Sequence, residues 1–279
     1  MPRFRVSAIS YLNTAPLMWN FEHEPTAKIL RDSFEVEYTI PSRCAQLLAE
    51  GKADIGIIPV AAYATIPDLR ILPGVAIASR AAVRSILLVS ERPLEEMRSV
   101  AVDSSSRTSA ALVQVLFAKH FQQDARFEQA DPELDKMLAH HDAALLIGDP
   151  ALKIDRSRYL TWDLAEEWRK FSGKPFVFAF WAARARSATD AELAGVGEVF
   201  RESRDTGVQN FRAIAEDWEL RLALPRELIV SYLSENIHYS LDPEYIEGMQ
   251  LFFRYAHEVA ALPKPPELHF VPELAGKRR

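Results

Sequence analysis

Four polar side chains crowd one turn near the start of the chain, namely Ser10, Tyr11, Asn13 and Thr14. The turn follows an apolar run over residues 4–9 that predicts a β-strand, and residues that suit a helix come after it. Ligands of open α/β sheets bind beyond the carboxyl ends of the strands, where this turn would lie. The alternative is that Ser10, Asn13 and Thr14 only cap backbone groups of a strand-to-helix turn. The rest of the sequence is needed to distinguish the ligand-binding interpretation from the capping interpretation.

A second polar turn, over residues 103–109, separates a predicted strand from a predicted helix. Its candidate ligand residues are Ser104, Ser105, Ser106, Arg107, Thr108 and Ser109. Hydroxyl groups and backbone N–H groups at a helix N-terminus bind anions, and each favourable charge there contributes roughly 0.3–1 kcal/mol. One serine would be no more than an N-cap, but this number of polar residues exceeds what a cap requires. We therefore expect an anion-binding turn.

Four further residues stand where a ligand could reach them. Gly148 and Asp149 follow an apolar strand, and Asp149 is either a base or a cap. Ser85 lies on a predicted strand between two lobes, and its hydroxyl either meets a ligand or is satisfied by the neighbouring strand. Arg43 follows the second strand and either meets a carboxylate or is solvated.

The composition is that of an ordinary globular protein, with 279 residues, 48% hydrophobic and 26% charged. The net charge of -6 gives no general attraction to nucleic acid. No apolar run of about 18 residues predicts a membrane span, and no apolar signal segment precedes the first polar turn. We therefore expect a cytoplasmic protein without nucleic-acid or membrane partners.

The sequence contains no motif for metal binding, nucleotide binding or serine-hydrolase chemistry. Cys44 is the only cysteine, which excludes an internal disulfide and a Cys-rich metal cluster. His140 and His141 are adjacent, and such a pair does not face one metal on a helix. The sequence has no H-E-x-x-H, Walker loop, G-x-G-x-x-G or G-x-S-x-G pattern. We expect no metal site.

The predicted elements follow the order of two α/β units with a helical C-terminal region. Strands are predicted at residues 4–9, 34–40, 54–60, 69–78, 84–90, 100–102, 125–129, 143–147 and 176–181. Helices are predicted at 42–51, 110–121, 190–205, 208–220, 225–236 and 243–261, with one more after Asp131. The expected helix signals are N-caps at Ser42, Asp131 and Asp242, a capping box of Thr189 with Glu192, and a stop at Gly51.

Two α/β units without a linker between them predict lobes that are joined by crossing strands. We expect the first lobe at residues 1–88 and 178–279, and the second lobe, inserted in it, at 89–177. The strands at 69–78 and 84–90 are expected to be neighbours, and residues 277–279 a frayed tail. An active cleft would then lie between the lobes.

Four segments, in order, resemble the chorismate dehydratases of menaquinone biosynthesis by the futalosine route. They are SYLNTAPL at 10–17, IPV at 58–60, DSSSRTS at 103–109 and IGDPAL at 147–152. The resemblance implies the two-lobed fold of type II periplasmic binding proteins. It also implies a lyase that removes water from chorismate to give 3-[(1-carboxyvinyl)oxy]benzoate, without metal or organic cofactor.

The resemblance assigns catalytic roles to Asn13 and Ser85 and leaves the polar turns to bind the dianionic substrate. The enzyme must supply orientation and donors for the charge that builds on the ring carboxylate as a proton leaves. No motif offers a His or Glu as base, and the enolpyruvyl carboxylate of the substrate is a candidate for that role. We expect a monomer or a homodimer.

Three alternatives share the fold. A dihydroxynaphthoate synthase of the same pathway typically shows His-Glu near the strand end where this chain has residues 147–149. A solute-binding protein of a transporter would need an export signal or lipid anchor, and a sensory regulator would need a DNA-binding module.

Overall fold

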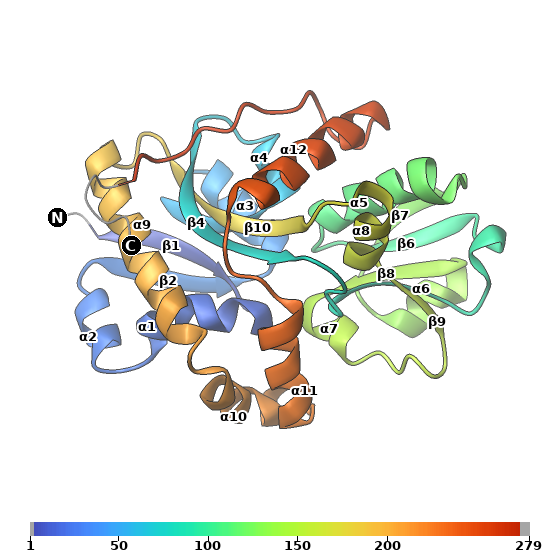
Figure 1. The fold of residues 1–279 in the computed structure, drawn as a ribbon, viewed down its shortest axis with the longest axis horizontal. Coiled ribbons are helices and arrows are strands. Elements are labelled where there is room, and N and C mark those ends of the chain that lie inside the picture. The colour runs from blue at the N-terminus through green and yellow to red at the C-terminus, as the bar shows by residue number, and fades with distance from the viewer. Residues whose placement is uncertain (1–2, 274–279) are drawn as a thin grey trace.

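The computed structural model describes residues 3–273, which form two α/β lobes (Figure 1). Each lobe is built on a five-stranded sheet. The strand order is β2-β1-β3-β10-β4 in the first sheet and β7-β6-β8-β5-β9 in the second. The two orders are equivalent, with β10 in the first sheet and β5 in the second each inserted next to the last strand of the order.

In the first sheet four strands run in one direction, and the fifth, β10, joins them in the opposite direction after the chain has formed the second sheet. Its strands are β1 (Phe4–Ile9), β2 (Phe34–Thr39), β3 (Ile55–Pro59), β4 (Leu69–Ser79) and β10 (Phe176–Arg184). β10 runs antiparallel to both β3 and β4. Every residue of β3 is buried, as its continuous apolar run predicts for a central strand.

The second sheet repeats this arrangement. Its strands are β5 (Ile86–Ser90), β6 (Ser99–Asp103), β7 (Arg126–Ala130), β8 (Ala143–Ile147) and β9 (Leu160–Asp163). β6 is parallel to β7 and β8, whereas β5 runs antiparallel to β8 and β9. The predicted strands are thus present, and β9 is an additional edge strand that the sequence pattern did not reveal.

The expectation that β4 and β5 are neighbours is wrong, because they lie in different sheets. The chain crosses between the lobes at residues 80–85, and it returns at 173–175. The buried carboxylate of Asp163 accepts N–H groups from Val83 at 3.0 Å and Arg84 at 2.6 Å, which holds the first crossing away from a hairpin. Each strand forms backbone hydrogen bonds within one sheet only. We therefore propose that the lobe boundaries lie in these two crossings.

Helices of the first lobe are short and begin next to strand ends. They are the 3-10 helix η1 (Leu12–Met18), α1 (Trp19–Glu22), α2 (Thr26–Leu30), α3 (Pro41–Ala49) and α4 (Val60–Tyr63). Pro16 lies inside η1 rather than in a first α-helical turn. The N-cap predicted at Ser42 is wrong, because α3 already begins at Pro41 with its fixed φ. Gly51 follows α3 with a φ of 71°, as expected of a stop residue.

Helices of the second lobe depart from prediction mainly at their starts. They are the 3-10 helix η2 (Leu94–Glu96), α5 (Thr108–Leu116) with the π-helix η3 (Phe117–Phe121), α6 (Leu134–His140), α7 (Gly148–Leu152) and α8 (Leu164–Ser172). The N-cap predicted at Asp131 is wrong, because α6 begins three residues later after Glu133. Helix α8 was not predicted, although Asp163 caps it by accepting two backbone N–H groups.

Four helical segments follow β10 and close the fold. They are α9 (Asp190–Gly207), α10 (Phe211–Leu222), α11 (Arg226–Ser231) with the π-helix η4 (Tyr232–Asn236), and α12 (Pro243–Glu258). The capping box of Thr189 with Glu192 is confirmed, and so is the N-cap at Asp242. Helix α12 lies against both lobes, since it contacts α5 as well as β10 (Figure 1). The tail predicted at residues 277–279 lies outside the described residues.

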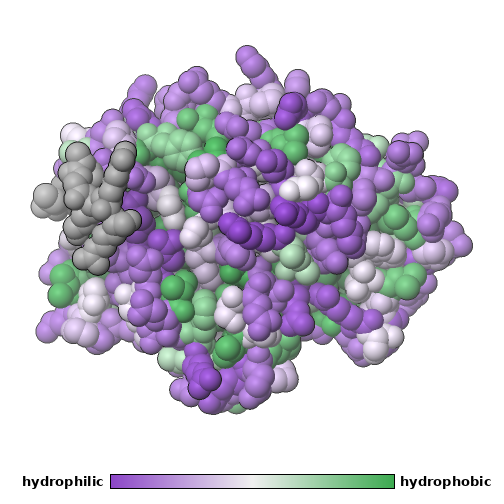
Figure 2. Space-filling view, in the orientation of Figure 1, coloured by the Kyte–Doolittle hydropathy of each residue, from purple (hydrophilic) through white to green (hydrophobic). Residues whose placement is uncertain are grey.

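Within residues 3–273, no helix is both long and apolar enough to cross a membrane. The face seen in Figure 2 is mostly hydrophilic, with hydrophobic residues scattered among the polar ones. Scattered apolar residues of this kind are normal on protein surfaces.

Substitutions of two glycines in α9 would test how closely this helix packs against η1. A Cβ at Gly207 would overlap the carbonyl of Pro16, whereas one at Gly195 would meet no atom within 4 Å. Gly207→Ala should therefore destabilise the protein by about 1–3 kcal/mol or more. Gly195→Ala, the matched control, should stabilise it by up to about 1 kcal/mol through helix propensity. Equal melting temperatures of the two variants would contradict this packing.

Candidate active site

A pocket lies between the lobes, where strands of both sheets end. Ile9, Pro59 and Ile147, at the carboxyl ends of β1, β3 and β8, form part of its wall. Its empty space, open mouth included, is about 510 Å³, and little of that space is wide enough for a water molecule. The pocket is therefore narrow.

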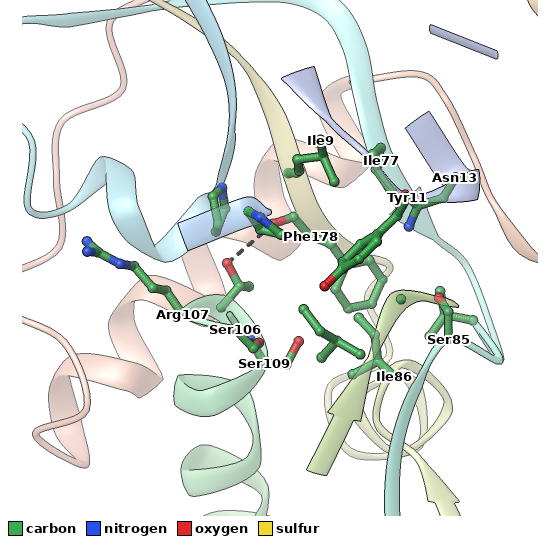
Figure 3. A pocket seen from close by; sticks show the side chains of 17 residues that line it. Ile9, Tyr11, Asn13, Ile77, Ser85, Ile86, Ser106, Arg107, Ser109 and Phe178 are labelled. Atoms are coloured by element: carbon green, nitrogen blue, oxygen red, sulfur yellow. Dashed lines mark hydrogen bonds between the residues drawn. The ribbon is translucent and has the colours of Figure 1, made fainter. Parts of the chain in front are cut away.

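One end of the pocket carries Asn13 and Ser85 (Figure 3). Asn13 belongs to η1 and is half-buried, and its Oδ1 accepts a weak hydrogen bond from the Thr14 hydroxyl at 3.4 Å. Ser85 ends the first crossing and is 1% exposed. Its Oγ accepts a hydrogen bond from the hydroxyl of Tyr232 at 2.9 Å. An amide from the first lobe and a hydroxyl from the crossing thus line the same end of the pocket.

The other end of the pocket is the N-terminus of α5. Ser106, Arg107, Thr108 and Ser109 line it, and all but Arg107 are buried. The first N–H groups of a helix have no intrahelical partner, so they can bind an anion. In Figure 3 the guanidinium of Arg107 extends away from the other labelled side chains. This end is therefore suited to a carboxylate.

The hydroxyl of Thr108 also joins the two lobes. It accepts the N–H of Ala61 at 3.1 Å and donates to the carbonyl of Phe178 at 3.3 Å, and both partners belong to the first lobe. Because this hydroxyl makes both hydrogen bonds within the protein, its role at the pocket wall is to connect the lobes.

Tyr11 and Gly148 form the tightest contact across the cleft. Gly148 has a φ of 63°, and a Cβ there would lie 2.5 Å from the ring of Tyr11. The Tyr11 hydroxyl lies 3.3 Å from the Oγ of Ser105 in the second lobe. Burial raises the pKa of Tyr11, so its phenol stays protonated at neutral pH. Tyr11 is thus an uncharged phenol in the pocket wall.

Asp149 lies behind the pocket rather than in its wall. Its Oδ1 accepts the N–H of Leu12 at 3.0 Å, which again joins the lobes. Burial raises its pKa to about 6, and the Leu12 N–H opposes this shift. Asp149 therefore holds η1 by accepting a hydrogen bond from its backbone.

Five other predicted site residues do not line this pocket. Ser10 and Thr14 face a separate hollow beside Trp218 and Arg221 of α10. Arg43 lies on α3, and Ser104 is exposed on the second lobe.

The fifth, Ser105, donates its hydroxyl to the buried carboxylate of Asp103 at 2.6 Å. Its backbone N–H also donates to Asp103, at 2.9 Å. Local pairing of this kind removes the side chain from ligand binding.

Several residues of the site were missed by sequence reasoning. The apolar walls include Pro41, Ile77, Val83 and Phe178. Tyr232, which contacts Ser85, comes from the C-terminal helices, where the sequence contains no motif. Only the strand pattern around Phe178 gave any signal for these positions.

The ionisable side chains among the described residues of the pocket wall are Tyr11 and Arg107. Within residues 3–273, no three His, Cys, Asp or Glu side chains are placed to hold a metal ion. The wall can therefore donate hydrogen bonds and bind negative charge, but it offers no side chain that is a base at neutral pH.

The fold is that of the periplasmic binding proteins. Protein AF1704 of Archaeoglobus fulgidus superimposes with a TM-score of 0.75 at 15% identity, over 93% of this chain and 98% of that one. The periplasmic aliphatic sulphonate binding protein SsuA of Escherichia coli gives 0.68 at 16% identity, over 100% and 96%. Both likenesses show the fold alone, and they place this chain in the class of two-lobed α/β proteins that share it.

Within this class, the chain belongs to the menaquinone biosynthesis family, whose sequence profile matches residues 4–258. It is 28% identical to the chorismate dehydratase of Thermus thermophilus over 281 residues, which cover 94% of this chain and 96% of the relative. The family resemblance seen in the sequence is confirmed.

The raised pKa of Asp149 predicts a pH-dependent stability. Between about pH 4 and pH 6 the folded protein binds a proton at Asp149 that the unfolded chain has released. Stability from this group is therefore present at low pH and is lost as the pH rises through 6. Asp149→Asn keeps an acceptor for the N–H of Leu12. Its melting temperature should exceed that of the unaltered protein at pH 7.5, and by much less at pH 4.5. The same difference at both pH values would contradict a raised pKa.

Proposed function

We propose that this protein is a chorismate dehydratase, a hydro-lyase that converts chorismate to 3-[(1-carboxyvinyl)oxy]benzoate. One observation carries the proposal: the cleft places neutral donors at one end and a helix N-terminus at the other. Such a site suits a small dianion. The named relative from Thermus thermophilus and the family membership support the same reaction.

The reaction breaks a ring C–H bond and the neighbouring C–O bond. The electron pair of the C–H bond enters the ring, where it is delocalised onto the ring carboxylate, and hydroxide leaves from the adjacent carbon and takes up a proton. The product ring is aromatic, so the overall step is strongly downhill. The protein has to orient the substrate and stabilise the charge that builds on the carboxylate.

In this proposal the ring carboxylate binds at the N-terminus of α5, beside Ser106 and Ser109. Asn13 and Ser85 then donate to the departing hydroxyl or to a substrate carboxylate. The wall lacks a basic side chain, and the enolpyruvyl carboxylate of the substrate takes the ring proton. Tyr11, a protonated phenol between the two ends, adds no negative charge that would repel the dianion.

The runner-up within the pathway, a dihydroxynaphthoate synthase, is disfavoured by the contact at Gly148. That enzyme typically has a histidine near this strand end, and here the Tyr11 ring leaves no room for a Cβ. A non-catalytic anion-binding protein is the second candidate, because SsuA shares the fold. We further propose a cytoplasmic location and a monomer or homodimer.

Purified protein should convert chorismate to the enolpyruvyl ether of 3-hydroxybenzoate. The product should form at the same rate with and without EDTA, because the proposed mechanism uses no metal. Liquid chromatography of timed samples, with heat-denatured protein as control, measures this. Chorismate that is bound but survives intact would favour the binding-protein alternative.

Asn13→Ala separates a catalytic role from a structural one. Loss of one preorganised donor should lower kcat roughly a hundred- to a thousand-fold. The melting temperature should change little, because no side-chain cap is formed at the start of η1. Ser10→Ala, outside the pocket, is the control and should keep its turnover. Near-normal kcat in Asn13→Ala would remove this residue from the active site.

A further inference from the structure

Among the described residues, the phenol of Tyr232 is the only hydrogen-bond partner of the Ser85 side chain. Tyr232 is 1% exposed, and its hydroxyl donates to the Oγ of Ser85 at 2.9 Å. Burial raises its pKa, so the phenol remains protonated and keeps acting as the donor. Because Ser85 accepts this bond, its own proton is directed elsewhere. The side chain of Ser85 faces the pocket.

Tyr232 lies where the helix departs from α-helical geometry. Helix α11 passes at Tyr232 into the π-helical turn η4, which inserts an extra residue and re-aims the side chains that follow. The same segment holds the crossing at two further points. Ser231 Oγ accepts a long hydrogen bond from Arg84 at 3.5 Å, and the amide of Asn236 donates to the carbonyl of Ala82 at 2.9 Å. The segment therefore holds the crossing just before Ser85.

The amide of Asn13 acts on the same phenol. Its contact with Tyr232 lowers the pKa of that group, although burial outweighs it. Tyr232 thus lies behind both proposed catalytic side chains and touches no pocket space itself. Tyr232 can therefore act on a substrate only through Asn13 and Ser85.

We propose that Tyr232 is a positioning residue that orients the Ser85 hydroxyl as a hydrogen-bond donor into the pocket. This inference rests on the proposed function, since it assigns a task within that reaction. A hydrogen bond accepted by a hydroxyl also polarises it, so Ser85 becomes a stronger donor toward developing negative charge. The C-terminal helices thereby contribute to the site without lining it.

The test is a double-mutant cycle on chorismate turnover. Tyr232→Phe should lower kcat about three- to tenfold, the value of one hydrogen bond, and leave KM nearly unchanged. Ser85→Ala should lower kcat about a hundredfold or more. The double variant should be no slower than Ser85→Ala alone, because Tyr232 acts through Ser85. Effects that multiply, or a normal kcat in Tyr232→Phe, would overturn the proposal.

Tyr239→Phe is the matched control. Tyr239 is equally a buried tyrosine near Tyr232, but its hydroxyl has no partner among the described residues. Its removal should leave kcat unchanged. If Tyr232→Phe does not fold, 3-fluorotyrosine at 232 replaces it: this near-isosteric, stronger donor should raise kcat, and an unchanged kcat overturns the proposal.

The two proposals fail in different ways. No turnover by the unaltered protein removes both. Turnover by the unaltered protein together with a neutral Tyr232→Phe removes only the role of Tyr232.

Discussion

The structure depends most on the contact between the Tyr11 ring and the α-carbon of Gly148. No side chain larger than hydrogen fits between them, so the contact sets how closely the lobes approach. The backbone N–H of Leu12, the next residue, is bound by Asp149 of the opposite lobe. Asn13 follows directly in the chain. The residue proposed to act on the substrate is therefore placed by the same turn that joins the lobes, and closure and assembly of the donor set occur together.

All the strands except β9, and both polar turns, were predictable because their causes are local. Buried parallel strands require continuous apolar runs, and polar turns at strand ends require residues such as Ser and Asn. The partner of each strand is not local, which is why β4 and β5 were wrongly paired. Their separation rests on the carboxylate of Asp163, which is about 80 residues away from the backbone groups it binds.

Which hydroxyl of the second turn faces the pocket was equally beyond the sequence. Ser105 and Ser106 are adjacent and chemically identical, yet only Ser106 lines the pocket. Ser105 is taken by Asp103, because an Asp two residues earlier competes for a nearby hydroxyl and N–H. Tyr232 is a harder case still. Its side chain contacts Ser85, about 147 residues away in the sequence, and no local pattern in the sequence marks such a contact.

The arrangement of charge follows from what the proposed substrate carries. An ionised carboxylate in the wall would repel a dianion at short range and low dielectric, where such interactions are strong. Asp103 and Asp149 instead lie one layer behind the wall, and burial raises the pKa of each toward the neutral form. The wall itself presents hydroxyls, an amide and a helix N-terminus. These neutral dipoles stabilise charge without binding a proton, and they leave the abstraction of the ring proton to the one strong acceptor that enters with the ligand, its own second carboxylate. A site built this way favours a reaction whose driving force is aromatisation and whose demand on the protein is orientation.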